Sequence, residues 1–250
     1  MGIDRRKFVT LSAGVLLAGR YAEQAAQAAA ATPCMLQPTE GSGVTTTALL
    51  TNGDSVNGYR PPGVMDGMGA WRWDETTVRL FVNHELGPDK AYPYTLDNGT
   101  KLRGARISWI DIDVESRAVK AANLAFSEIR DRRGEVVTDP RQVHEHWNRR
   151  INIGLNHLCS AQGYARSEFG FADDLMFTHE ETSALEDHPH GGTVWALDVR
   201  EQRLWALPAL GRGSWENVTA IETPDQDQPD GHIALIMGDD LEFGRAPLYM

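Results

Sequence analysis

The sequence predicts an all-β protein, and the β-architecture that it favours is a β-propeller. Turn-forming residues are frequent, with 24 glycines and 12 prolines, and helical periodicity is scarce beyond the N-terminal region. Three short apolar runs, at 78–85, 174–181 and 232–240, each end in acidic or His-plus-acidic residues. A buried strand requires only the apolar run. In a propeller the innermost strands line a central channel, so acids from different blades meet there.

The N-terminal region is predicted to be an export signal. Arg5 and Arg6 precede an apolar stretch at 11–19, and small residues follow, with a cleavage site at Ala28. The pattern resembles a twin-arginine signal peptide over 1–28, which implies the twin-arginine export machinery as a partner and a periplasmic or secreted protein. The stretch is too short to span a bilayer, so we expect no stable membrane span. The alternative is an ordinary amphipathic N-terminal helix.

The rest of the chain is expected to form a leader with the first strands over 29–74 and a propeller domain over 75–250. Its last residues, 245–250, read as the start of another strand, so we expect an incomplete propeller. The segment 141–150 is interpreted as a helix or a loop. The predicted strands are 77–83, 106–114, a hairpin of 193–199 with 203–207, and 233–237, followed or preceded by polar loops such as 225–230.

The net charge of the chain argues against some kinds of binding partner. Its 250 residues carry a formal net charge of −11, which argues against nucleic acid and anionic membranes. An acidic protein that handles an anionic substrate needs bound cations to reverse the local field.

The two cysteines, Cys34 and Cys159, could pair in an exported protein. A lone cysteine is often a small buried hydrophobic residue. Cys159, however, lies among Asn156, His157 and Ser160. This polar setting favours a thiolate metal ligand over a disulfide.

Carboxylates are the other candidate ligands. Asn83, His84 and Glu85 end the first run, and Asp239 and Asp240 follow Gly238 at the end of the third. Each cluster could also be a solvated turn. The second run ends in two adjacent acids, and adjacent residues on a strand point to opposite faces. Glu180 and Glu181 can therefore share one centre only if the backbone turns near 182–183.

Arg212 and Glu216 lie in a Gly-rich segment, 211–217, that also contains Asn217. Arginine is suited to bidentate binding of phosphate or carboxylate. A surface arginine beside a buried Trp215 is the structural alternative.

Six segments in order resemble the PhoX-type alkaline phosphatase family. They are Asn-His-Glu at 83–85, Leu-Cys-Ser-Ala at 158–161, Thr-His-Glu-Glu at 178–181, Gly-Thr-Val-Trp-Ala-Leu-Asp at 192–198, Leu-Gly-Arg-Gly-Ser-Trp-Glu-Asn at 210–217 and Met-Gly-Asp-Asp at 237–240. The resemblance covers roughly 75–250. The chain lacks the family's later Arg-Pro-Glu-Trp-like segment, and its cysteine lies in Cys-Ser-Ala-Gln rather than a Gly-rich sequence.

The resemblance implies a β-propeller with a deep central site that hydrolyses small phosphomonoesters with Fe³⁺ and Ca²⁺. Arg212 or Asn217 would hold a phosphate oxygen. Two other functions stay open: a calcium-dependent propeller lactonase or esterase, in which Cys159 is dispensable, and a non-catalytic secreted propeller stabilised by metal. The residues that the resemblance implies as metal ligands are Cys159, Glu180, Glu181 and Glu216, with Glu85, Asp239 and Asp240 in the same ring.

Overall fold

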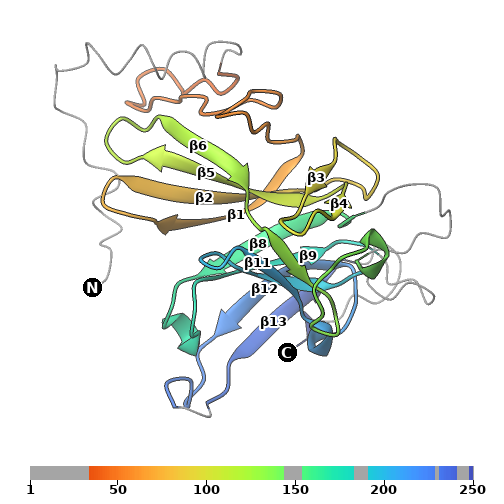
Figure 1. The fold of residues 1–250 in the computed structure, drawn as a ribbon. Helices are drawn as coiled ribbons and strands as arrows, with labels where there is room; N and C mark the ends of the chain where they lie inside the picture. The colour runs from red at the N-terminus through yellow and green to blue at the C-terminus, as the bar shows by residue number, and fades with distance from the viewer. Residues whose placement is uncertain (1–33, 144–153, 183–190, 229–230, 241–247, 250) are drawn as a thin grey trace.

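The computed structural model describes residues 34–143, 154–182, 191–228, 231–240 and 248–249, and these form an all-β structure (Figure 1). The expected signal peptide and most of 141–150 lie outside the described residues. Within them, the helical segments are short 3-10 turns at Pro140–Gln142, Glu168–Gly170 and Pro208–Leu210. None of the described helices is long and apolar enough to cross a membrane.

The first sheet is an antiparallel meander of four strands in the order β1-β2-β5-β6. Apolar residues of β2 alternate between its two faces, with Phe81 in the core beneath the sheet and Val82 in a smaller cluster on its other side. A two-stranded hairpin of β3 and β4 interrupts the connection from β2 to β5. The strands are β1 (Met65–Arg72), β2 (Thr77–His84), β3 (Tyr94–Thr95), β4 (Lys101–Leu102), β5 (Arg106–Asp113) and β6 (Val119–Leu124).

The second sheet has five strands in the order β7-β11-β10-β9-β8, and the third has the order β12-β13-β14. All their pairings are antiparallel except β7 with β11. The strands are β7 (Glu128–Arg130), β8 (Leu158–Tyr164), β9 (Leu175–Glu180), β10 (Val194–Asp198), β11 (Arg203–Ala206), β12 (Trp215–Ile221), β13 (Ala234–Asp239) and β14 (Leu248–Tyr249).

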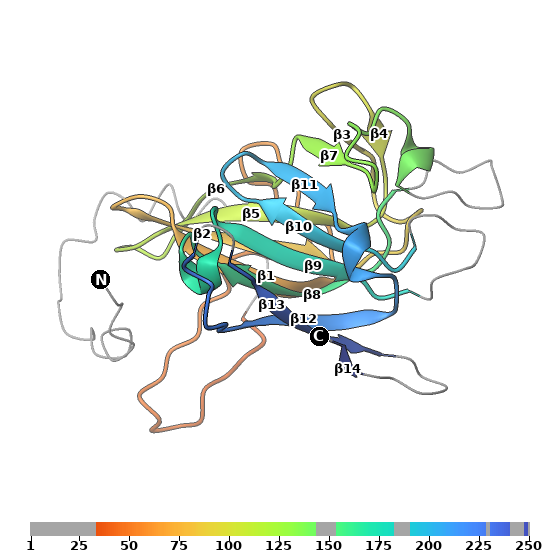
Figure 2. The same ribbon diagram turned by 90° about the horizontal axis from the view of Figure 1, so that it is seen from below.

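The three sheets follow one another in chain order, with the second between the other two (Figures 1 and 2). One hydrophobic cluster, which includes Phe81, Leu158 and Trp195, fills the space between the first and second sheets. A second, which includes Phe177 and Val218, lies between the second and third. No sheet closes on itself within the described ranges. The predicted all-β class is thus confirmed, as are the strands expected at 77–83, 106–114, 193–199, 203–207 and 233–237.

The first and second sheets meet most closely where β1 crosses β8. A Cβ atom added to Gly67 of β1 would lie 2.1 Å from the backbone nitrogen of Ala161 in β8. Only glycine allows two backbones to approach this closely. Gly67 therefore sets the distance between the sheets next to Cys159 and Ser160.

A stack of indole and guanidinium groups joins the same two sheets at the other end of their strands. The Arg79 guanidinium lies 3.8 Å from the Trp73 ring centroid and 4.0 Å from that of Trp109, and Arg200 lies 4.1 Å from Trp73. Asp111 holds Arg79 through two hydrogen bonds of 2.7 and 2.9 Å. Because Arg200 follows β10 of the second sheet, the stack connects the two sheets through stacked rather than purely hydrophobic contacts.

Candidate metal centre

Three side chains from different strands converge at the interface of the second and third sheets. Cys159 of β8, Glu181 just after β9 and Glu216 of β12 each offer a donor atom, and these atoms lie within 4.8 Å of one another. The Cys159 thiol donates a hydrogen bond of 3.2 Å to Glu216 Oε2. The Ser160 hydroxyl donates to the backbone carbonyl of Glu216. Residues far apart in sequence thus form one compact donor set.

Two irregularities in strand pairing create this arrangement. The register of β8 against β9 shifts between Leu158 and Ala161, and that of β12 against β13 shifts between Trp215 and Asn217. A bulge redirects side chains that regular alternation would send to other faces. The two bulges lie across from each other, with Cys159 and Glu216 in contact between them.

Asn83, at the end of β2, braces the bulge in β8. Its side-chain amide donates hydrogen bonds to the Cys159 carbonyl at 2.5 Å, the Ser160 carbonyl at 3.3 Å and Thr178 Oγ1 at 2.7 Å. Asn83 is fully buried. One side chain of the first sheet therefore fixes two strands of the second sheet beside the candidate centre.

The donor groups stand in an environment that disfavours their charged forms. Burial and the hydrogen bond to Glu216 raise the pKa of Cys159. Burial raises the pKa of Glu181, and the negative charges of Glu216 and Asp240 add to the effect, while the Cys159 hydrogen bond opposes it. Carboxylates that repel each other in this way are neutralised by shared protons or by a cation.

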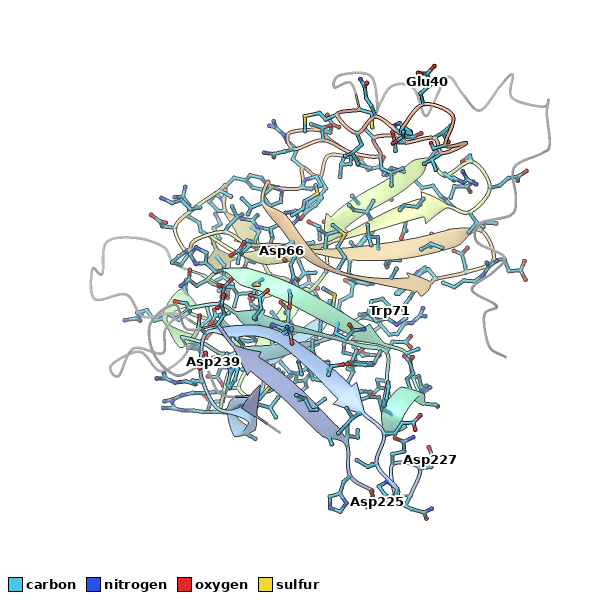
Figure 3. All side chains as sticks on the ribbon, turned by 180° about the vertical axis from the view of Figure 1, so that it is seen from behind. Glu40, Asp66, Trp71, Asp225, Asp227 and Asp239 are labelled. Atoms are coloured by element: carbon cyan, nitrogen blue, oxygen red, sulfur yellow. The ribbon has the colours of Figure 1, made fainter. Side chains whose placement is uncertain are left out.

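Two further carboxylates extend the cluster toward β1 and β2. Burial raises the pKa of Glu85, and the charges of Asp66 and Glu181 raise it further, as does a hydrogen bond with Asp66. Asp66, in β1, was not among the predicted residues. Figure 3 shows it toward the same end of the sheets as Asp239. No apolar run precedes Asp66 in the sequence, so strand-end reasoning gave no signal for it.

Glu180 does not join the group, because β9 stays extended through it and strand alternation turns its side chain to the opposite face. Its carboxylate is fully buried and accepts backbone hydrogen bonds from Asn156 at 3.0 Å and Thr193 at 3.4 Å. Burial raises the pKa of Glu180 to about 8, although these hydrogen bonds oppose the shift. The backbone turn that would bring both glutamates together does not occur within Leu175–Glu180, and Ser183 lies outside the described residues.

The structure separates the remaining predicted residues. Asp239 accepts a hydrogen bond of 3.0 Å from the Ser214 backbone, whereas Asp240 lies within electrostatic range of Glu181. Asn217 is exposed on the face of β12 opposite Val218, which packs in the second core cluster. Arg212 is exposed and forms an isolated β-bridge with Thr193. The group therefore contains Cys159, Glu181 and Glu216, with neighbours Asp66, Glu85 and Asp240.

His157 shapes the backbone beside Glu181. It has a positive φ of 43°, which is uncommon for a residue other than glycine. Its Nδ1 lies 2.6 Å from the Asn156 side-chain oxygen, and its carbonyl accepts a hydrogen bond of 2.9 Å from the Glu181 backbone. The predicted polar neighbourhood of Cys159 thus exists and holds the end of β9.

Both cysteines are free thiols, and Cys34 lies in the leader with its Sγ near Leu36 and Thr46. The structure therefore contains no Cys34–Cys159 disulfide. Comparisons of the chain with protein-family models, curated proteins and solved structures found no match.

Proposed function

We propose that the protein is a metal-dependent phosphomonoesterase of the PhoX type, built on a β-propeller to which these sheets belong. The single observation that carries the proposal is the group of Cys159, Glu181 and Glu216, whose donor atoms lie within 4.8 Å of one another. The order of the sheets supports the propeller, since each sheet packs face to face on the next as propeller blades do.

The donor chemistry fits an iron–calcium centre. A thiolate selects a transition metal over calcium, whereas carboxylates serve both kinds of ion. Cys159, Glu181 and Glu216 would hold iron, and the neighbouring Asp66, Glu85 and Asp240 would hold calcium. When bound, such ions neutralise phosphate oxygens and lower the pKa of a bound water.

The remaining residues have supporting roles in this proposal. Asn83 holds the backbone of Cys159, and the His157 carbonyl holds that of Glu181. Arg212 is the candidate phosphate contact, because its bridge to Thr193 keeps it next to the end of β9. Arg5 and Arg6 support export of the folded, metal-loaded protein by the twin-arginine route.

Metal analysis combined with an activity assay tests the proposal. Purified protein reconstituted with Fe³⁺ and Ca²⁺ should retain both ions and hydrolyse p-nitrophenyl phosphate. Cys159→Ser should lose iron and activity together, whereas Cys34→Ser is a matched control that should keep both. Iron retention and activity that are equal in Cys159→Ser and the parent would refute the proposed centre.

A calcium-dependent lactonase or esterase is the second candidate, and the carboxylates Asp66, Glu85 and Asp240 favour it because they need no thiol. Calcium alone in the purified protein, with lactone or carboxyl-ester hydrolysis that survives Cys159→Ser, would support this candidate. Stoichiometric metal without hydrolysis of any of these substrates would leave a structural role for the ions.

A further inference from the structure

His179 is a buried imidazole without a partner. Its side chain is 0% exposed, and neither ring nitrogen has a hydrogen-bond partner among the described residues. A buried polar group left in this state costs roughly 1–3 kcal/mol. Such a group in a folded protein calls for a specific explanation.

Strand alternation fixes the direction of this side chain. In β9, Met176 belongs to the core cluster shared with the first sheet, and Thr178 contacts Asn83 of that sheet. Phe177 belongs to the cluster shared with the third sheet. His179 therefore points toward the third sheet, on the same side of β9 as Phe177.

The bulge in β8 lies directly opposite His179. Glu180 pairs with Leu158 and Thr178 pairs with Ala161, so Cys159 and Ser160 occupy the positions between these pairs. The Cys159 thiol also faces the third sheet, because it contacts Glu216 of β12. Residues directly opposite on neighbouring strands have Cβ atoms about 4.5–5.5 Å apart. The imidazole and the thiol thus share one interface.

A second buried histidine shows that this fold can provide hydrogen-bond partners for both ring nitrogens of an imidazole. His84, at the end of β2, is also 0% exposed. Its Nδ1 lies 3.1 Å from the Gly63 carbonyl and its Nε2 lies 2.7 Å from Ser108 Oγ. Of these two buried histidines, His179 alone has two ring nitrogens without a partner among the described residues, and it lies beside the candidate centre.

We propose that His179 is the fourth protein ligand of the cation held by Cys159, Glu181 and Glu216. This inference rests on the proposed metal centre and deepens it. His179 stands outside the group of donor atoms within 4.8 Å, so ligation requires its ring to turn toward the Cys159 thiolate. One nitrogen, one sulfur and two carboxylate donors form a set that selects a first-row transition metal over calcium.

Cobalt binding tests the proposal, with Co²⁺ followed by its thiolate charge-transfer absorption. His179→Leu should lower the Co²⁺ affinity by at least about tenfold. The same variant should leave the melting temperature of the metal-free protein unchanged or raise it, because it removes an unpartnered imidazole. Pulsed electron paramagnetic resonance of the loaded parent should show coupling to an imidazole nitrogen that is absent in His179→Leu.

His84→Leu is the matched control. It breaks two hydrogen bonds, so the metal-free protein should melt at a lower temperature, whereas the nitrogen coupling should persist. His84→Gln, which keeps a hydrogen-bonding side chain, replaces it if His84→Leu does not fold.

The outcomes separate the two proposals. A parent that binds no Co²⁺ would overturn the centre and the His179 ligand together. A parent that binds Co²⁺ while His179→Leu binds it equally well, with the nitrogen coupling intact, would overturn the His179 ligand alone. Weaker binding in His179→Leu without any nitrogen coupling in the parent would also overturn it, since the imidazole would then affect the site without ligating the ion.

Discussion

β2 and β9 end in similar residues, Asn-His-Glu at 83–85 and His-Glu-Glu at 179–181, but the structure uses the two ends differently. At the end of β2 the histidine has two hydrogen-bond partners and the asparagine donates to both β8 and β9. At the end of β9 the histidine has no partner among the described residues, and Glu181 faces other carboxylates. The end of β2 is held by hydrogen bonds, whereas the end of β9 keeps an imidazole without a partner among the described residues and carboxylates that repel each other.

The largest expected effect comes from Gly67→Ala, which disrupts the close approach of β1 to β8 beside Cys159 and Ser160. The added Cβ would meet the Ala161 backbone at 2.1 Å, and backbone cannot move aside as a flexible side chain can. We expect the unfolding free energy to fall by about 3 kcal/mol or more, measured by urea denaturation. Gly238→Ala is the control, since its Cβ would meet only Asn217 Oδ1 at 3.8 Å. Equal stability of the two variants would contradict the close sheet contact.

Asn83→Ala removes the amide that holds the bulge in β8 by hydrogen bonds. The variant deprives the Cys159 and Ser160 carbonyls of a donor, so we expect a loss of about 2–3 kcal/mol in unfolding free energy. Co²⁺ affinity should fall as well, because the bulge that presents the thiol is no longer held. Asn123→Ala, at an exposed position in β6, should change neither quantity. A stable Asn83→Ala protein would show that the β2 end does not support the site.

The third prediction concerns how stability depends on pH through Glu180, whose side chain lies on the face of β9 opposite Glu181. Glu180 has a pKa of about 8 in the folded protein, above its unfolded value, so the folded state holds the proton more tightly. Its stabilising contribution is present below a pH of about 4.5 and is lost as the pH rises through about 8. Burial lowers the pKa of both His84 and His179 to about 4, so these groups oppose the trend only at acidic pH. Above a pH of about 6.5 the metal-free protein should therefore unfold at lower urea concentration as the pH rises.

Glu180→Gln should flatten this pH dependence, since glutamine does not ionise. The raised pKa values of Glu85 and Glu181 act in the same direction, so a smaller slope should remain. A slope that is identical in Glu180→Gln and the parent would rule out Glu180 as its main source.

The smallest expected effect is that of Glu85→Gln, which removes one charge from the β2 end of the carboxylate cluster. In the metal-free protein at neutral pH it should raise the unfolding free energy by about half a kcal/mol, because it relieves repulsion from Asp66 and Glu181. In the presence of Ca²⁺ the gain should disappear or reverse. Thermal melts with calcium and with a chelator measure both changes. Glu75→Gln, at an exposed position, is the control and should respond to neither condition.

The sequence predicted the strands with continuous apolar runs, because burial on both faces leaves a signal in the residues themselves. β2 and β9 are of this kind, whereas β5 was predicted from its alternating pattern and β13 from a short apolar run. β1 is not of this kind, since its residues Met65–Arg72 include two glycines and are exposed or half-exposed except for Trp71. It forms because β2 pairs with it and β8 packs on it. Asp66 was missed for that reason.

The residue types of the candidate site were predictable from the sequence, but the directions of their side chains were not. The point at which β9 ends decides whether Glu180 or Glu181 faces the third sheet, and a difference of one residue reverses the answer. The bulges beside Cys159 and Glu216 depend on pairing between strands far apart in sequence. Whether a buried histidine finds a partner depends on the same pairing, so His84 and His179 look alike in the sequence.

Tryptophan fluorescence can report on the stack that Arg200, Trp73, Arg79 and Trp109 form. Trp73 has a guanidinium within about 4 Å from each of two sheets, and indole emission is sensitive to nearby charge. The stack lies at the opposite end of the strands from the cysteine. Because Trp215 adjoins Glu216, the emission must be read from Trp73 and Trp109 alone. A change there on metal binding would signal a tilt of whole sheets, whereas unchanged emission from these two residues would confine the response to the carboxylate end.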